Sequence, residues 1–227
     1  MPHDPYYEII EKPVEPLFDP SKTVLINVDL QYACAHPDGL MGRMCREKGR
    51  PALLQERWDF VDEILPRVRK LQNACRAAGV EVMHIRVKYL TADCRDGQRS
   101  LARKEKARYS NPRDVEFLEM VAPVDDEIII DKTSAGTFNS TALDQILRNM
   151  GRDRLLFTGV VTEGCVELTA RNAADRGYYT TLVSDGCASS TRLAHYDALQ
   201  RMTDGGLIKS RTVNELVDEI ATARPAL

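Results

Sequence analysis

Cys165 is the residue whose position in the sequence most favours chemistry. It follows an apolar run at residues 155–157 and a turn at residues 162–164, and helix-forming residues continue from it to Gly177. This order predicts a buried strand, a tight turn and an amphipathic helix with the thiol in its first turn. The unpaired N–H groups and the dipole of a helix N-terminus stabilise an anion, so this thiol could serve as a nucleophile. A small core cysteine is the alternative interpretation.

Asp29 and Lys132 come after two other predicted strands. Asp29 follows the apolar run at residues 23–28, and Lys132 follows the run at residues 127–130. If the strands are parallel, their carboxyl ends lie at one edge of the sheet, where ligands bind in such folds. A carboxylate beside a thiol can take its proton and later protonate a leaving amine, while a lysine stabilises the thiolate. Taken singly, Asp29 could cap a turn and Lys132 could be a surface residue.

Strands and helices alternate along the rest of the chain. Continuous apolar runs predict strands, and apolar residues at helical spacing predict helices that end at glycines such as Gly79 and Gly151. The strands are expected over residues 23–28, 80–87, 127–130, 155–157, 180–183 and 206–208, and the helices over residues 56–78, 139–150, 165–176, 191–202 and 213–222. This order predicts an α/β, three-layer, Rossmann-like fold with helices on both faces of a mostly parallel six-stranded sheet.

No break in composition divides the chain into two domains. We expect residues 1–20, which contain several prolines, to form an N-terminal arm on the surface or on a neighbouring subunit. Residues 21–227 are then expected to form a single domain. Residues 32–51 have no clear period and are predicted to be a loop. Residues 88–112 are rich in Arg and Lys and are predicted to be a loop or a lid.

The composition argues against several classes of function. The formal net charge of -3 gives no electrostatic basis for binding nucleic acid or an anionic membrane. No apolar stretch is long enough to span a bilayer, and the N-terminus lacks the basic and apolar regions of a signal peptide. The six cysteines are scattered without a CxxC pair, so we expect reduced thiols in a cytoplasmic protein.

Three segments of the sequence resemble the isochorismatase-like cysteine hydrolases. They are DLQ at residues 29–31, DKTSAGTF at residues 131–138 and GVVTEGCVE at residues 159–167. The resemblance extends from about residue 23 to at least residue 202, and the segment around the cysteine is its most specific part. It implies a catalytic triad of Asp29, Lys132 and Cys165 that works without a cofactor.

The resemblance also implies a mechanism. A non-proline cis peptide at Val160–Val161 is expected to direct the backbone N–H groups of Val161 and Cys165 at the substrate oxygen, which forms an oxyanion hole. The Cys165 thiolate would attack a carbonyl carbon, and Asp29 would pass the thiol proton to the departing nitrogen. Water would then release the acid from the thioester, while Lys132 holds the charges in place.

The sequence departs from the nicotinamidase-type members of this family, which carry a metal-binding Asp-x-His with a second histidine nearby. The corresponding stretch, residues 84–93, has no such pattern. His84 falls within a predicted strand, and His36 and His195 are single and widely spaced. No metal is therefore predicted.

Hydrolases of small ureido and carbamoyl amides, such as biuret, triuret and ureidoacrylate, show the greatest resemblance to the KTSAGTFNST and TEGCVE segments. The predicted function is therefore a cysteine-dependent amidohydrolase that cleaves the C–N bond of such an amide and releases ammonia or an amine. Gln31, Phe138 and Asn139 are expected to flank the substrate pocket, and Glu163 is expected to meet a polar N–H of the substrate. The expected partner is a small-molecule amide.

Two other functions stay open at this point. One is an isochorismatase or another C–O hydrolase on the same scaffold, and the other is a catalytically silent binding subunit. The intact triad argues against the silent subunit. Members of the family are commonly dimers or tetramers, so the resemblance implies a homo-oligomer. Glu167 and Arg171, further along the cysteine helix, are expected to be structural or to lie at a subunit contact.

Overall fold

The described part of the chain folds around a sheet of six parallel strands, which confirms the predicted fold class. The computed structural model describes residues 16–97 and 111–223, together with residues 9 and 14. The strand order is β3-β2-β1-β4-β5-β6, and all neighbouring strands are parallel. The strands are β1 (Thr23–Val28), β2 (Glu81–Val87), β3 (Ile128–Lys132), β4 (Arg154–Val160), β5 (Tyr179–Ala188) and β6 (Ile208–Arg211).

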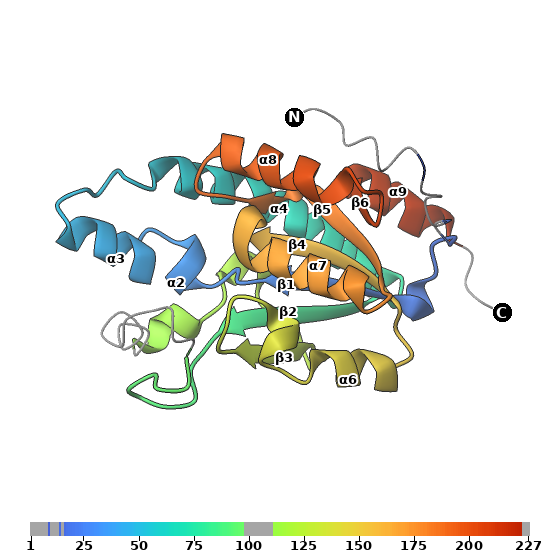
Figure 1. The fold of residues 1–227 in the computed structure, drawn as a ribbon, viewed down its shortest axis with the longest axis horizontal. Helices are drawn as coiled ribbons and strands as arrows, with labels where there is room; N and C mark the ends of the chain where they lie inside the picture. The colour runs from blue at the N-terminus through green and yellow to red at the C-terminus, as the bar shows by residue number, and fades with distance from the viewer. Residues whose placement is uncertain (1–8, 10–13, 15, 98–110, 224–227) are drawn as a thin grey trace.

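Helices cover both faces of the sheet (Figure 1). One layer contains α6 (Leu143–Asn149), α7 (Glu167–Asp175) and α8 (Arg192–Thr203), and the other contains α4 (Gln55–Ala77) and α9 (Val213–Thr222). The side chains of β1 alternate between the two layers, as the pleat of a strand requires. Val24 and Ile26 pack in the core with α6, α7 and α8, whereas Leu25 packs with α4 and α9.

The strand order reverses between β1 and β4. The chain leaves β1 through α4 to form β2 and β3, and it returns to the other side of β1 as β4. The crevice outside the carboxyl ends of two such strands is the usual ligand site of an open α/β sheet. Asp29 directly follows β1, and the turn that contains Cys165 directly follows β4.

The prediction of a loop over residues 32–51 was wrong. The segment contains α2 (Tyr32–Ala35), of four residues, and α3 (Leu40–Glu47), of eight residues. These helices are too short to show a helical period in the sequence. All four residues of α2 are buried, and α3 buries Leu40 and Cys45, so packing against the rest of the domain stabilises both helices.

Other boundaries differ by a few residues. The helix expected from residue 139 begins at Leu143, because residues 137–139 form a 3-10 turn and the Thr141 side chain accepts a hydrogen bond from the Leu143 N–H at 3.2 Å. Relative to the expected strands, β3 extends to Lys132, β5 extends to Ala188 and β6 begins at Ile208. Pairing with neighbouring strands, rather than the local apolar run, fixes these ends.

Two predicted segments lie partly outside the described residues. Most of the expected arm over residues 1–20 lies outside the described residues. The middle of the expected loop or lid over residues 88–112 also lies outside them. Among the described helices, none combines the length and apolar character that crossing a membrane requires.

Candidate active site

The structure brings Asp29, Lys132 and Cys165 together at the carboxyl edge of the sheet. Asp29 follows β1, Lys132 is the last residue of β3, and Cys165 lies in a π-helical turn, Thr162–Val166, between β4 and α7. The Lys132 ammonium nitrogen lies 2.9 Å from Oδ2 of Asp29 and 3.4 Å from Sγ of Cys165. The amine therefore bridges the carboxylate and the thiol.

Lys132 reaches this position because its side chain is long and wholly enclosed. Its residue pairs with Val87 at the end of β2, and its stem spans the width of β2 to Asp29 beside β1. The side chains of Lys132 and Asp29 are 0% and 1% exposed. The ammonium also donates to the carbonyl oxygen of Ser134 at 3.0 Å, so a carboxylate, a thiol and a carbonyl oxygen all lie beside the same buried nitrogen.

Asp29 has an unusual backbone conformation, with φ of 53°. A residue with a side chain pays roughly 1 kcal/mol or more to occupy this left-handed region, and such residues cluster at functional sites. The conformation places the carboxylate beside Lys132 at the wall of the site, where the side chain is 1% exposed. Asp29 therefore adopts a strained backbone conformation at the point where its carboxylate enters the site.

The thiol of Cys165 is less acidic than its place in the sequence suggested. Burial raises its pKa, the charge of Asp29 raises it further, and Lys132 lowers it only in part. For Lys132, burial lowers the pKa, but the charges of Asp29 and Cys165 outweigh this effect and raise it. The lysine is thus a fixed cation, and Cys165 keeps its proton until a base removes it.

A cavity of about 170 Å³ opens onto these residues. This volume is below the range of about 300–1,000 Å³ that is usual for pockets of drug-sized ligands, so the cavity suits a smaller molecule. The Val160–Val161 peptide is cis, as the family resemblance implied. The lining residues are Asp29, Cys34, Met41, Arg57, Val87, Tyr89, Lys132, Thr133, Ser134, Ala135, Val160, Val161 and Cys165.

Gln31 does not line this cavity, although the sequence suggested that it would. Its side-chain amide donates to the carbonyl oxygens of Val87 at 3.0 Å and Asp114 at 2.8 Å. Its side-chain oxygen accepts the N–H of Val87 at 2.6 Å. Gln31 therefore ties the end of β2 to the segment around Asp114 behind the site.

Phe138, Asn139 and Glu163 also lie away from the lining of the cavity. Phe138 is buried in the core, with its ring centroid 5.9 Å from that of Tyr178. Asn139 is exposed. The carboxylate of Glu163 accepts a hydrogen bond from the Ser189 hydroxyl. None of these three residues is among those that line the cavity beside Asp29, Lys132 and Cys165.

Several lining residues escaped the sequence analysis. Cys34 and Met41 come from α2 and α3, which the sequence did not predict, and Ser134 and Ala135 follow β3. Tyr89 could have been found, because it comes two residues after the end of β2 and so near the same edge of the sheet. Arg57, in the first turn of α4, gave no signal that set it apart from other helical arginines.

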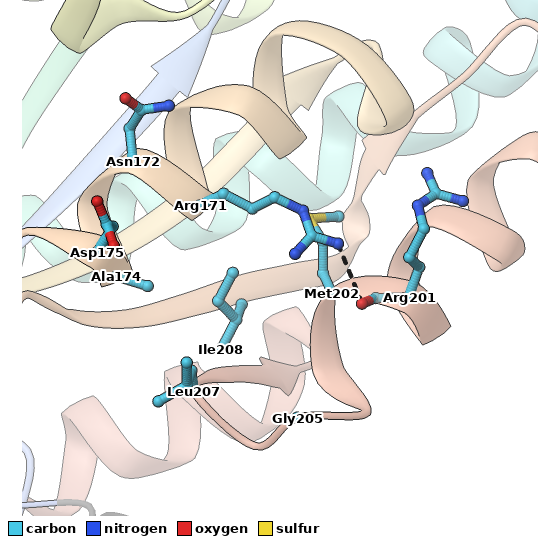
Figure 2. A pocket seen from close by; sticks show the side chains of 9 residues that line it. All are labelled: Arg171, Asn172, Ala174, Asp175, Arg201, Met202, Gly205, Leu207 and Ile208. Atoms are coloured by element: carbon cyan, nitrogen blue, oxygen red, sulfur yellow. Dashed lines mark hydrogen bonds between the residues drawn. The ribbon is translucent and has the colours of Figure 1, made fainter. Parts of the chain in front are cut away.

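A second and larger hollow, of about 380 Å³, lies between α7, the end of α8 and β6 (Figure 2). Its lining contains no cysteine, histidine or lysine. Arg171 donates to the carbonyl oxygen of Arg201 at 3.1 Å, the dashed line of Figure 2. The buried carboxylate of Glu167 contacts Arg171 at 2.9 Å and Arg201 at 2.6 Å. These residues join α7 to α8, in keeping with the structural role expected of Glu167 and Arg171.

No group of three or more potential metal ligands occurs within residues 16–97 and 111–223. His84 is buried in β2, and its Nε2 lies 3.0 Å from the carboxylate of Glu127. His195 is buried in α8, and its Nδ1 shares a hydrogen bond of 2.8 Å with the Thr162 hydroxyl. Both histidines therefore have protein partners.

The six-stranded parallel fold is that of a family of hydrolases, as comparison with known proteins shows. Residues 23–213 match the isochorismatase domain, so the chain belongs to this family. It is similar to a cysteine hydrolase from Pseudomonas syringae pv. phaseolicola, with a TM-score of 0.78 and 25% identity over 95% of this chain and 100% of that one.

Two curated relatives are amide hydrolases. Ureidoacrylate amidohydrolase RutB from Methylobacterium radiotolerans is 28% identical over 94% of this chain and 83% of its own length. N-carbamoylsarcosine amidase from an Arthrobacter species is 28% identical over 52% of this chain and 47% of its own length. The relatives of this chain therefore include enzymes that hydrolyse amide bonds.

Proposed function

We propose that this protein is a cysteine-dependent amidohydrolase that cleaves the C–N bond of a small ureido or carbamoyl-type amide. The observation that carries the proposal is the Lys132 ammonium, which lies 2.9 Å from Asp29 and 3.4 Å from Cys165 beside a cavity of about 170 Å³. The similarity to a ureidoacrylate amidohydrolase and an N-carbamoylsarcosine amidase supports the substrate class.

The first half of the reaction forms a thioester. Asp29 takes the proton of the Cys165 thiol, and the thiolate attacks the carbonyl carbon of the amide. The backbone N–H groups of Val161 and Cys165 hold the oxyanion of the tetrahedral intermediate. Asp29 then gives the proton to the nitrogen, the C–N bond breaks and the amine leaves. A thiol that keeps its proton at rest requires this transfer, which gives Asp29 its role as general base.

The second half regenerates the enzyme. Asp29 takes a proton from water, and the hydroxide attacks the thioester carbon. The C–S bond breaks, the acid leaves, and the Cys165 thiolate takes back a proton from Asp29. The fixed positive charge of Lys132 compensates the negative charge that moves between carboxylate and sulfur, so one buried ammonium serves both halves of the cycle.

Ammonia release from a panel of amides tests this function. The panel contains biuret, triuret, ureidoacrylate, N-carbamoylsarcosine, nicotinamide and maleamate, with isochorismate followed separately. Wild type should turn over a ureide, and Cys165→Ala should abolish the reaction. Cys45→Ala serves as the control, because Cys45 is a buried cysteine on α3 that does not line the cavity.

Each other outcome on the panel points to one of the alternatives. Cleavage of isochorismate without ammonia from any amide would replace the amidohydrolase by a C–O hydrolase. Silence on every substrate would favour the binding subunit. Turnover that survives Cys165→Ala would overturn the nucleophilic role of the thiol.

We also propose that the protein works as a cytoplasmic homo-oligomer. The six cysteines, all within the described residues, form no disulfide, as expected in a reducing compartment. Leu168 on α7, Tyr196 on α8 and Leu207 before β6 are 42%, 59% and 65% exposed, and a subunit contact would cover such side chains. Light scattering after size-exclusion chromatography tests the oligomer: a mass of 25.5 kDa at micromolar concentration would contradict it.

A further inference from the structure

Arg57 is a buried cation in the wall of the cavity. It lies in the first turn of α4, its residue is 7% exposed, and it lines the same cavity as Cys165. Arginine cannot lose its charge in a protein, so burial normally requires a carboxylate or phosphate beside it. Within residues 16–97 and 111–223, no acidic side chain pairs with Arg57.

The hydrogen bonds of Arg57 leave part of the guanidinium without an acceptor. Nη2 donates to the carbonyl oxygen of Cys34 on α2, and Nη1 makes a long contact of 3.4 Å to the Ser190 hydroxyl. Nε is buried and has no acceptor in the described structure. Two neutral oxygens and the Trp58 ring, whose centroid lies 5.6 Å from the guanidinium carbon, thus contact the side chain, but none of them carries a negative charge.

The other charges of the cavity do not compensate it either. The lining residues include one acidic side chain, Asp29, and two cations, Lys132 and Arg57. Asp29 is already paired with Lys132 at 2.9 Å. Arg57 therefore supplies a net positive charge at the wall of a cavity that is small enough for one ligand to touch both it and Cys165.

We propose that Arg57 binds a carboxylate of the substrate, so that the protein selects ureido or carbamoyl amides that carry an acid group. A carboxylate matches the planar fork of an arginine and accepts two parallel hydrogen bonds from it. The scissile carbonyl then lies at Cys165 while the acid group lies against α4. This proposal rests on the proposed amidohydrolase function and narrows its substrates to the amides that carry an acid group.

The first experiment compares two substrates that differ in charge. They are hydantoate, which is N-carbamoylglycine, and its uncharged counterpart 2-hydroxyethylurea. Wild type should prefer hydantoate in kcat/KM, and Arg57→Met should reduce that preference by about 100-fold. Arg57→Lys should retain part of it, because the charge remains and the fork is lost. A simple loss of packing would lower turnover of both substrates and leave their ratio unchanged, which would overturn the proposal.

A matched control variant is available on the same helix. Arg67 lies in α4 with its side chain exposed, so Arg67→Met changes the net charge equally without touching the cavity. It should leave the ratio of the two substrates unchanged. An equal loss of preference in Arg67→Met would show that overall charge, and not the cavity wall, selects the acid.

A binding measurement separates this proposal from the proposed function. Calorimetry with the Cys165→Ser protein measures the affinity for hydantoate, malonate and succinate without any reaction. Micromolar to low-millimolar binding that Arg57→Met weakens by about 100-fold supports the carboxylate site, even if the panel shows no amide hydrolysis. Failure of all three acids to bind, or binding that Arg57→Met leaves unchanged, would overturn it, even if neutral ureides are turned over.

Discussion

The ammonium of Lys132 lies 2.9 Å from the carboxylate of Asp29, and neither side chain is exposed by more than 1%. Removing one member of such a pair leaves an uncompensated buried charge, which costs about 3–5 kcal/mol. Lys132→Met should therefore lower the free energy of unfolding by about that amount at pH 7, as measured in urea. The double variant with Asp29→Asn should recover much of the loss. A single variant as stable as the double one would contradict the buried pair.

The effect of Asp29 on the thiol gives a second prediction. Because burial and then the charge of Asp29 raise the pKa of Cys165, the wild-type thiol should react with iodoacetamide only at high pH. Asp29→Asn removes the negative charge but leaves Lys132, so alkylation should become faster at pH 7 to 8 while turnover is lost. Mass spectrometry of the Cys165 peptide follows the rate. Slower alkylation of this variant would show that Asp29 generates a resting thiolate.

The remaining cysteines provide an internal control for that measurement. Burial raises the pKa of both Cys75 and Cys187 to about 12. Their peptides should stay unmodified in both proteins while the native fold persists. Modification of these peptides at the same rate as Cys165 would indicate unfolding rather than a change in thiolate content.

The lowered pKa of His195 predicts how the stability of the folded protein changes with pH. Burial and the charge of Arg192 lower its pKa from 6.5 to about 4, although the charge of Glu163 opposes them. Between these values the unfolded chain binds a proton that the folded protein does not, so this histidine destabilises the fold as pH falls from about 6.5 to about 4. His195→Gln should flatten the decline of the urea midpoint in that window. His36→Gln, at a half-exposed histidine, is the control, and an unchanged slope in His195→Gln would contradict the assignment.

Gly159 is required where β4 approaches β1. A Cβ atom on this residue would lie 2.0 Å from the carbonyl oxygen of Val28, and its φ is 121°. Gly159→Ala must therefore displace the strand ends that carry Asp29 and the cysteine turn, and it should cost more than about 3 kcal/mol. Gly177→Ala is the matched control, with φ of 89° and no atom within 4 Å of the added Cβ. Equal losses in the two variants, measured by urea unfolding, would show that the clash is relieved cheaply.

The framework of the site could be predicted from the sequence because it depends on strand ends. Apolar runs mark the strands, and parallel pairing then brings Asp29, Lys132 and Cys165 to one edge whatever the loops do. The acidity of the thiol could not be predicted in the same way. It depends on the burial of Cys165 and on the separation of charges, and the sequence encodes neither directly.

The walls of the cavity depend on loops and short helices, and the sequence therefore predicted them poorly. Gln31 follows Asp29 closely and looked like a substrate contact, yet backbone groups of Val87 and Asp114 use its side-chain hydrogen bonds. Arg57 looked like one more arginine of an amphipathic helix. Only the packing of α2 against α4 shows that it is enclosed without a carboxylate.

Capture of the acyl group by hydroxylamine tests the covalent role of Cys165 most directly. Two ureides that share a carbamoyl group and differ in the leaving amine should pass through the same thioester. The ratio of hydroxyurea to carbamate should then be identical for both substrates, and Cys165→Ala should form neither product. A ratio that depends on the leaving amine, products from Cys165→Ala, or no Cys165-dependent product from any ureide would contradict a thioester amidohydrolase.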